Sequence, residues 1–385
     1  MAESAFARSP FIAIWETTRA CALACVHCRA AAIARRDPGE LTTAEGKALL
    51  DRIAAFGEPP PLVVFTGGDP LRRPDVAELV AHGTRRGLMV SLTPSGTAAV
   101  TEDKLRALKE AGLVRLAVSL DGAGADAHDA FRRVRGSYRN TLRIIERARS
   151  LGLGLQINTT VCRQTVEELP KLVEQVTGFG VLLWALFFLI PVGRAEADQG
   201  LAADEIEEVL RWAADLQPRV SFGIKTTEAP QYHRVLGERA RPAGGFSADW
   251  GSPGTIAAPE RMSADWGSAG AISGPPHMNK PLRAGRAVTD GNGFVFVDHL
   301  GNICPSGFLP LPAGNVRRDD LVAVYRDHPL FVSLRDPARL GGRCGRCEWR
   351  ERCGGSRARA YALHGDPLAE DPGCVYEPAV RESGA

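Results

Sequence analysis

The sequence carries almost no net charge and contains no long uninterrupted hydrophobic run. Its 47 Lys and Arg residues nearly balance 45 Asp and Glu residues, which gives a net charge of +2 at pH 7. Such a balance provides no strong attraction to nucleic acid or to an anionic membrane. The longest apolar run, from Val181 to Pro191, is too short to cross a bilayer. The N-terminal stretch shows no signal-peptide pattern. We therefore expect a cytoplasmic protein with neither nucleic acid nor membrane as a partner.

Cysteine is the informative residue type, because its number and distribution argue against disulfide bonds. There are nine cysteines, and seven of them fall into two groups, one within residues 21–28 and one within residues 344–374. Such groups fit metal binding in a reducing compartment better than disulfide pairing. Of the other two, Cys162 is interpreted as a plain buried thiol, and Cys304 is either an extra metal ligand or a small apolar residue.

The first cysteine group has the spacing CxxxCxxC, formed by Cys21, Cys25 and Cys28 directly after the apolar run 11–15. A [4Fe–4S] cluster normally takes four thiolates, so three local ligands leave one iron open to a small molecule. A structural zinc site needs four closed ligands, and a fourth is not obvious nearby. His27 is adjacent to Cys28 and poorly placed to chelate the same ion. The spacing favours a [4Fe–4S] cluster, with zinc as the alternative.

This stretch resembles the signature of the radical S-adenosylmethionine (SAM) superfamily. In that family the open iron chelates the amino and carboxylate groups of SAM, and one electron from the cluster splits the sulfonium to give a 5′-deoxyadenosyl radical. The resemblance implies that Cys21, Cys25 and Cys28 are the catalytic cluster ligands. It also implies a low-potential electron donor such as ferredoxin or flavodoxin.

Strands and helices alternate from Phe11 to about Lys225. Thr42 and Thr165 each begin a capping-box pattern, Thr101 can cap another helix, and Pro74 suits the first turn of a fourth. The predicted strands, several of them near-continuous apolar runs typical of buried parallel strands, are Phe11–Glu16, Leu62–Thr66, Leu88–Thr93, Val114–Leu120, Leu153–Val161 and Leu182–Ile190. Six such units predict an α/β fold, a partial (β/α)6 TIM-like barrel. Its ligands should gather at the C-terminal ends of the strands, where the CxxxCxxC loop lies.

Two glycine-containing motifs follow the second and third predicted strands. Residues 66–70 resemble the GGEP motif that holds the SAM amino group, which assigns Gly67, Gly68, Asp69 and Pro70 to SAM binding, although Asp replaces Glu here. Residues 93–97 resemble a TNGT segment, in which Ser95 takes the place of the Asn. Taken alone, a pair of glycines such as Gly67 and Gly68 is more often a simple turn.

The remaining SAM contacts are assigned to loops after later strands. Residues 119–122 match an SLDG motif, so Ser119 and Asp121 suit ribose hydroxyls. Residues 131–138 resemble a block in which Arg132 pairs with the SAM carboxylate, and Asn158 suits a ribose or carboxylate contact. Three further residues, Pro191, Val192 and Gly193, belong to a segment that resembles the one backing the adenine ring. A helix cap or turn is the alternative for the polar residues.

Composition divides the chain into three predicted regions. Residues 1–240 form the barrel, and the stretch 226–234 is expected to cross its open side. Residues 241–278 are rich in Gly, Pro, Ala and Ser, contain a Ser-Ala-Asp-Trp-Gly-Ser repeat, and read as a mobile insertion. Residues 279–385 form a small C-terminal domain.

That domain carries the second cysteine group, with the pattern CxxCx₅C…C formed by Cys344, Cys347, Cys353 and Cys374. Four thiols make a closed site that suits zinc or [4Fe–4S]. The segment resembles the SPASM/twitch extension of radical SAM enzymes, which implies an auxiliary [4Fe–4S] cluster. Only Cys304 is available for a second one, because Ser306 stands where a Cys is expected, so we predict a single auxiliary cluster.

The substrate is the least determined feature. Residues 353–361 and 365–367 resemble the branch that acts on tetrapyrroles, so we predict abstraction of hydrogen from a C–H bond during modification of a tetrapyrrole side chain. The arginines of 132–135 and 357–359 favour an anionic substrate if they reach the barrel mouth. The alternatives are a ribosomal peptide maturase, a sugar or nucleoside dehydrogenase or decarboxylase, and a non-catalytic metal-binding scaffold.

Overall fold

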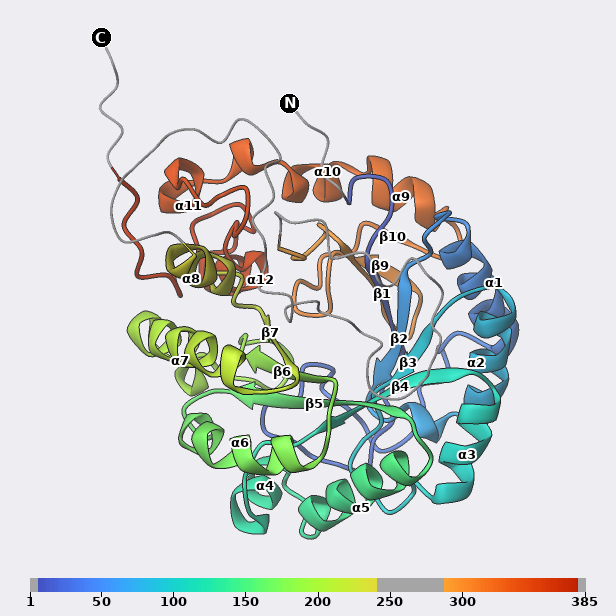
Figure 1. Cartoon of the computed structure of the whole chain (residues 1–385). Coiled ribbons are helices and arrows are strands. Elements are labelled where there is room, and N and C mark those ends of the chain that lie inside the picture. Colours follow the sequence, from blue (N-terminus) through green and yellow to red (C-terminus); the bar gives the residue numbers. More distant parts are fainter. Residues whose placement is uncertain (1–5, 241–286, 380–385) are drawn as a thin grey trace.

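A curved sheet of ten strands forms the centre of the molecule (Figure 1). The structure, a computed structural model, describes residues 6–240 and 287–379. Strands β1 to β7 are parallel and pair in chain order, and every crossover between them carries at least one α-helix on the outer side. Their bounds are β1 Ile12–Thr18, α1 Thr43–Ala54, β2 Leu62–Gly67, α2 Val76–Arg85, β3 Val90–Leu92, α3 Glu102–Glu110, β4 Leu113–Ser119, α4 Ala125–Arg132, α5 Ser137–Ser150, β5 Gly154–Val161, α6 Leu169–Gly178, β6 Leu183–Phe188, α7 Ala203–Leu216 and β7 Gly223–Thr227.

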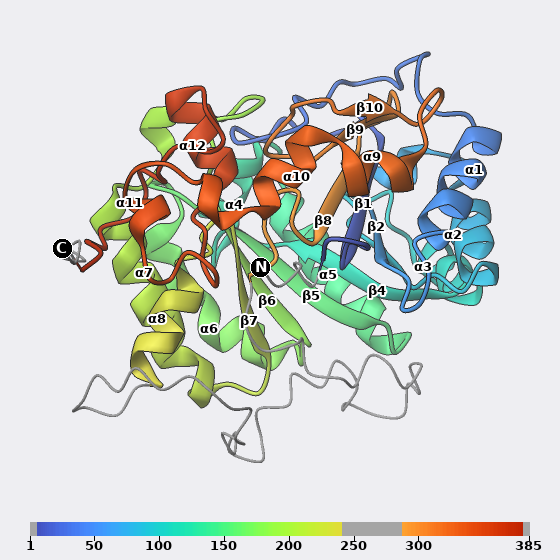
Figure 2. The same ribbon diagram turned by 90° about the horizontal axis from the view of Figure 1, so that it is seen from above.

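The C-terminal part continues the same sheet on the other side of β1. Strand β8 pairs with β1 in parallel, and β9 and β10 follow as antiparallel neighbours. Residues 298–302 turn the chain, and β9 returns along β8 as a hairpin. The remaining elements are α8 Tyr232–Arg239, β8 Phe294–Val297, β9 Asn302–Cys304, β10 Gly314–Asn315, α9 Leu321–Asp327, α10 Pro329–Arg335, α11 Gly342–Arg346 and α12 Arg357–His364. Helices α11 and α12 lie near α8 at the edge formed by β7 (Figures 1 and 2).

The six predicted strands are all present, but a seventh was missed. Strand β7 contains a lysine and two threonines and therefore lacks the apolar run that marks its neighbours. The stretch expected to cross the open side of the barrel instead begins with the end of β7 and continues into α8, which starts at Tyr232. The predicted insertion at 241–278 lies outside the described residues, and the predicted domain boundaries stay predictions.

Helix caps were predicted with mixed success. Thr42 forms the full capping box with Glu45, and Thr101 accepts the N–H of Lys104 at 3.3 Å. The capping box at Thr165 is wrong: the Thr165 hydroxyl donates to the carbonyl of Thr160 at 2.6 Å, and a short 3-10 turn, Val166–Glu168, separates Thr165 from α6. Pro74 precedes α2 rather than lying in its first turn.

The two faces of the barrel strands differ in burial. Side chains on the outer face, including Trp15, Phe65 and Trp184, are fully buried against the helices. On the inner face, Ile14 and Asn158 remain partly exposed. Because strand residues alternate between faces, this pattern describes a barrel whose lumen is open to solvent. Within residues 6–240 and 287–379, none of the helices combines the length and apolar composition that crossing a membrane requires.

Candidate functional site: two groups of cysteines

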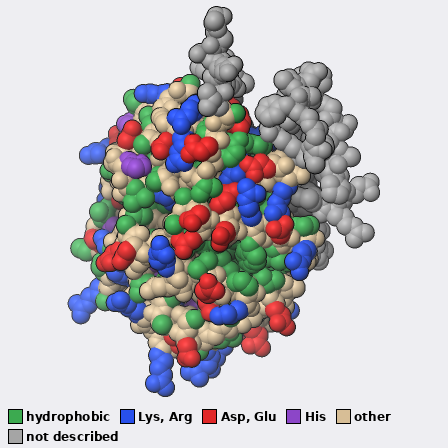
Figure 3. Space-filling model, turned by 90° about the vertical axis from the view of Figure 1, so that its left-hand side faces the viewer, with side chains coloured by type: hydrophobic (Ala, Val, Ile, Leu, Met, Phe, Trp, Pro, Cys, Tyr) green, Lys and Arg blue, Asp and Glu red, His purple; other side chains and the backbone are tan. Residues whose placement is uncertain are grey.

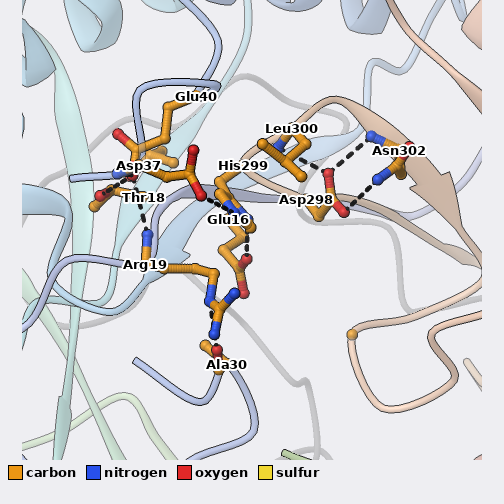
Figure 4. Close-up of polar contacts among 12 residues, drawn as sticks. Glu16, Thr18, Arg19, Ala30, Asp37, Glu40, Asp298, His299, Leu300 and Asn302 are labelled. Carbon is orange, nitrogen blue, oxygen red and sulfur yellow. Dashed lines mark hydrogen bonds and ion pairs between the residues drawn. The ribbon is translucent and has the colours of Figure 1, made fainter. Parts of the chain in front are cut away.

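The CxxxCxxC loop follows β1 at the C-terminal edge of the parallel strands. Arg19, just past the end of β1, donates from Nε to the carbonyl of Ala30 at 2.9 Å and from Nη2 to that of Ala31 at 2.7 Å (Figure 4). A backbone bond from Cys21 to the carbonyl of Ile33, 2.8 Å long, closes the loop at its base. The loop therefore has a fixed shape, and its three cysteines carry free thiols.

The loop after β6 packs directly onto the cysteine loop. Gly193 has φ +70°, and a Cβ there would lie 2.2 Å from the carbonyl oxygen of Arg29 and 2.4 Å from that of Cys28, so only glycine fits. The next residue, Arg194, donates from Nε to the carbonyl of Cys25 at 3.0 Å. The sequence marked this segment as an adenine contact but gave no role to Arg194, whose position only the tertiary structure reveals.

Polar groups face the three sulfur atoms. Cys21 Sγ lies 3.1 Å from Ser95 Oγ, and Cys28 Sγ accepts a backbone N–H at 3.4 Å. Cys25 Sγ lies 3.7 Å from Nη1 of Arg132. Burial raises the pKa of Cys21. Without a cation nearby, the Cys21 thiol would stay protonated. A thiolate that binds iron is stabilised by hydrogen-bond donors and by positive charge, and such groups surround these sulfurs. The three cysteines therefore fit a cluster.

The residues of the GGDP motif line the neighbouring side of the loop. Gly67 has φ +143°, and a Cβ there would lie 2.2 Å from the carbonyl oxygen of Thr18. Ser95 Oγ donates to the carbonyl of Gly68 at 2.9 Å, which joins this motif to the loop after β3. Asp69 is buried, and its Oδ2 has no hydrogen-bond partner among the described residues. Burial also raises the pKa of Asp69. A ligand with an ammonium group would satisfy this oxygen.

Arg132 and Asp121, predicted to contact SAM separately, form an ion pair. Arg132 Nε donates to Asp121 Oδ2 at 2.7 Å, and Asp121 Oδ1 accepts the N–H of Thr160 at 2.7 Å. Burial opposes ionisation of Asp121, but the charge of Arg132, the nearby histidines and the hydrogen bond from the Thr160 N–H together outweigh it and hold the pKa of Asp121 below its usual value. Asp121 thus has little capacity left for a ribose, whereas Arg132 still directs one nitrogen toward Cys25.

The other predicted contacts lie on the same rim. Ser119 and Asn158 are paired across β4 and β5 and are partly exposed. Pro70 is buried and begins a 3-10 turn, and Pro191 and Val192 are partly exposed in the loop that packs on the cysteines. The structure thus brings the predicted residues from six strands, β1 to β6, to one edge.

A buried charge network beneath the cysteine loop was not predicted. Glu16 on β1 lies 2.9 Å from His299 Nδ1 (Figure 4). Its other carboxylate oxygen lies 2.6 Å from Arg29 Nη2. Burial disfavours the charged form of Glu16, but Arg29 and His299 together lower its pKa. His299 comes from the turn after β8, so this network ties the C-terminal segment to the residue that follows Cys28. Sequence patterns cannot detect a pair that is separated by most of the chain.

The second cysteine group lines one hollow of about 420 Å³ beside α8. Three of the sulfurs accept backbone N–H groups. Cys344 Sγ accepts the N–H of Asp371 at 3.3 Å, and Cys347 Sγ and Cys353 Sγ each accept a backbone N–H at 3.4 Å. Burial raises the pKa of Cys347 and Cys353, and that of Cys374 to about 11. These thiols stay protonated unless a metal compensates them, so this donor set also fits a thiolate-ligated centre.

Cys304 and Ser306 lie away from that hollow. Cys304 is buried on β9, and Ser306 Oγ accepts the N–H groups of Phe308 and Leu309, each at 3.1 Å. Neither residue is among those that line the hollow. This placement favours the reading of Cys304 as a small buried residue. Cys162 is fully buried too, as predicted.

Comparison with known proteins identifies the family. Residues 15–176 match the model of the Radical SAM superfamily. The chain is 37% identical over 366 residues to an AdoMet-dependent heme synthase of Nitratidesulfovibrio vulgaris, covering 94% of this chain and 92% of that protein. The chain belongs to the radical SAM superfamily. A second AdoMet-dependent heme synthase, from Methanosarcina barkeri, is 37% identical over 377 residues, covering 98% of this chain and 99% of that protein.

Solved structures share the fold. Streptococcus suis SuiB bound to S-adenosylmethionine superposes with a TM-score of 0.68 at 15% identity, covering 96% of this chain and 78% of that one. The predicted α/β fold with a Cys-rich C-terminal region is confirmed. A radical SAM enzyme uses a [4Fe–4S] cluster with SAM, and when bound this cluster supplies the electron that releases the 5′-deoxyadenosyl radical.

Buried charges fasten the C-terminal cysteines of this radical SAM enzyme to its barrel. Arg359 pairs with Asp371 at 3.1 Å and donates to the carbonyl of Glu228 at 2.7 Å. Asp371 also accepts Gln231 Nε2 at 2.7 Å. Arg357 is 2% exposed and Arg359 5%. The expectation that these two arginines meet substrate at the barrel mouth is therefore wrong, because their guanidinium groups are used within the protein.

Proposed function

We propose that Cys21, Cys25 and Cys28 hold the [4Fe–4S] cluster and that SAM binds between their loop and the neighbouring rim loops. The observation that carries this assignment is the buried Oδ2 of Asp69 in the GGDP motif, which has no hydrogen-bond partner within residues 6–240 and 287–379. Arg132, held by Asp121, provides the charge for the SAM carboxylate. The remaining proposed contacts are Gly67, Gly68, Pro70, Ser95, Ser119, Asn158, Pro191, Val192 and Gly193.

The second group, Cys344, Cys347, Cys353 and Cys374, holds one auxiliary [4Fe–4S] cluster in this proposal. Four thiols leave no open iron, so this site suits electron transfer rather than direct binding of substrate. A ferredoxin or flavodoxin in the cytoplasm is the proposed electron donor. Acidic and basic side chains are interspersed on the face of the molecule that Figure 3 shows.

The proposed substrate is a tetrapyrrole, one of whose side chains is modified after hydrogen abstraction from a C–H bond. The support is the 37% identity to proteins named AdoMet-dependent heme synthase over 92% and 99% of their lengths. Both cysteine groups and the rim residues fall within the matched part of the chain. The fold shared with SuiB does not favour a peptide substrate, because at 15% identity the likeness shows architecture alone.

The test uses anaerobically reconstituted protein with dithionite and SAM. We expect 5′-deoxyadenosine to form. We also expect iron-coproporphyrin to be converted to a product of changed mass, and siroheme-derived compounds and short peptides to stay unchanged. Absence of 5′-deoxyadenosine from protein with a full complement of iron would contradict the cluster and SAM assignments. Formation of 5′-deoxyadenosine with a modified peptide and an unchanged porphyrin would contradict the substrate alone.

A further inference from the structure

The chain between the last turn of α4 and the middle of α5 carries an excess of positive charge. Residues 132–143 contain five arginines and no aspartate or glutamate, although acidic and basic residues nearly balance over the whole chain. The proposed SAM site uses only Arg132. The other four are exposed, and none of them forms an ion pair with any residue of 6–240 or 287–379. We call these four the basic patch: Arg133, Arg135, Arg139 and Arg143.

The basic patch begins where α4 touches the cysteine loop. The carbonyl of Phe131, in the last turn of α4, accepts the N–H of Val26 at 3.2 Å. Arg132, the last residue of α4, directs Nη1 toward Cys25 Sγ, which lies 3.7 Å away. Arg133 is the next residue of the chain. The patch therefore starts one residue beyond a side chain that contacts a proposed cluster ligand.

The segment that joins α4 to α5 is held in a fixed shape by Asp129. The carboxylate of Asp129 accepts the Ser137 hydroxyl at 2.8 Å and the N–H of Tyr138 at 2.7 Å, and its backbone carbonyl accepts the N–H of Val134 at 3.2 Å. This acidic residue is thus occupied by the start of α5 rather than by an arginine. Arg133 has φ +53°, a left-handed backbone that glycine adopts with less strain. A long charged side chain at such a position points to a use for that side chain.

The basic patch continues along the outer side of α5. Arg139 and Arg143 are four residues apart, so they lie on one face of the helix, separated by about 6 Å along its axis. The opposite face of α5, which includes Ile144 and Ile145, is buried. Helices α4 and α5 are neighbours on the outer side of the sheet (Figure 1). The patch therefore extends from the cysteine loop along the outside of the barrel, away from the lumen.

We propose that the basic patch is the docking surface for a small acidic protein that carries single electrons. The inference rests on the proposed function and deepens it, because a cluster held by Cys21, Cys25 and Cys28 needs an electron before SAM is cleaved. In each encounter the reduced carrier gives up one electron, the cluster accepts it, and the oxidised carrier leaves. Electron transfer slows steeply with distance, so the carrier must dock beside the loop that holds the cluster. Exposed arginines attract an acidic carrier to that place and release it readily, because exposed charge pairs are weak and are screened by salt.

The test measures binding of an oxidised, FMN-loaded acidic flavodoxin to the reconstituted enzyme by isothermal titration calorimetry. One variant combines Arg135→Glu with Arg139→Glu and reverses two charges of the patch. A second combines Arg135→Gln with Arg139→Gln and removes the two charges without placing like charge near Asp129. The matched control combines Arg85→Glu with Arg318→Glu. It changes the net charge as much as the first variant does, and both of its arginines are exposed and lie outside the patch.

The parent should bind flavodoxin, and its affinity should fall as salt is added. Reversing two charges should weaken binding by about tenfold and removing them by about threefold, because each exposed charge pair contributes little by itself. The control variant should bind like the parent. With dithionite, a small reductant that needs no docking surface, all variants should form 5′-deoxyadenosine at the parent rate. With reduced flavodoxin at limiting concentration, only the two patch variants should be slower.

Absence of flavodoxin binding by the parent, or equal affinity of the parent and the charge-reversed variant, would overturn the docking surface. An equal loss of affinity in the control variant would do the same. Binding of cytochrome c, a basic electron carrier, or of single-stranded DNA as tightly as flavodoxin would contradict an acidic protein as the partner. Absence of 5′-deoxyadenosine with dithionite would instead contradict the proposed function, and the flavodoxin affinities would still decide whether the patch binds an acidic carrier.

Discussion

The two cysteine groups are built in opposite ways. The first has three thiols on one loop, and this loop is held by Arg19 and Arg194 from opposite sides of the barrel. The second has four thiols within residues 344–374, held by nearby backbone N–H groups and by the buried pair of Arg359 and Asp371. The first therefore depends on the whole sheet, whereas the second depends on a short segment fastened to α8.

This difference in construction indicates that the first cysteine group is a reactive site open to a ligand and that the second is a closed site. Beside the three-thiol loop lie a buried carboxylate oxygen without a hydrogen-bond partner in the described part of the chain and an arginine directed at a sulfur. These groups have a purpose only if a polar ligand completes the site. The four-thiol hollow is lined by its own cysteines and needs no outside ligand. We infer that the number of thiols and the polarity of the facing wall together decide which cluster takes SAM.

The largest effect is expected from Cys25→Ala, because two thiolates cannot hold the cubane next to the SAM site. The variant should lose about four of the eight irons that two cubanes contain, and it should form no detectable 5′-deoxyadenosine. Cys162→Ala is the matched control: its thiol is equally buried but lies outside both groups, so it should keep iron and activity. SAM cleavage by Cys25→Ala at the parent rate would show that the loop was wrongly assigned.

Cys347→Ala should affect the second cysteine group and spare the first, because the two groups share no ligand. We expect loss of the auxiliary cluster and a lower midpoint of thermal unfolding, because metal binding stabilises the segment that supplies the ligands. Uncoupled SAM cleavage should persist. The measurement combines iron analysis with quantification of 5′-deoxyadenosine, and finding zinc with no second iron signal in the anaerobically purified parent would disprove the auxiliary cluster.

Arg359→Gln tests whether buried charge fastens the second group. Removing one partner of a buried ion pair typically costs about 3–5 kcal/mol, and we expect the lower end because Asp371 keeps other donors. Denaturant unfolding measures the loss. Arg106→Gln, which breaks an exposed pair with Glu102, should change stability by about 0.5 kcal/mol or less. A loss of porphyrin affinity without a loss of stability would restore Arg359 as a substrate ligand.

A smaller effect concerns pH and the junction between the groups. Burial and Asp290 raise the pKa of Glu228 well above 4.5, and Ser356 Oγ donates to Glu228 at 2.6 Å. A raised folded-state pKa means that the native state binds more protons than the unfolded state above about pH 4.5. Stability should therefore fall as pH rises from 4.5 toward the raised pKa. Glu228→Gln should flatten this dependence in unfolding curves, and an unchanged slope would contradict the shift.

The sequence alone was sufficient to predict those features whose residues lie close together in the chain. The CxxxCxxC loop, the four C-terminal cysteines and six apolar strands each show in a short window of residues. Strand β7 was missed because Lys225, on its inner face, faces an open lumen and interrupts the apolar pattern. The roles of Arg359 and of the Glu16–His299 pair could not be predicted, since their partners are distant in the chain and only burial distinguishes a structural arginine from one that binds substrate.

Electron paramagnetic resonance of the reduced protein, with and without SAM, tests most directly whether one group is open and the other closed. Two triple variants isolate the clusters: Ala at 344, 347 and 353 leaves only the first, and Ala at 21, 25 and 28 leaves only the second. We predict that SAM shifts the signal of the first cluster, because SAM binds its open iron, and leaves the second unchanged. A SAM-dependent shift in the protein that keeps only the C-terminal cluster, or no shift in the other, would contradict the assignment.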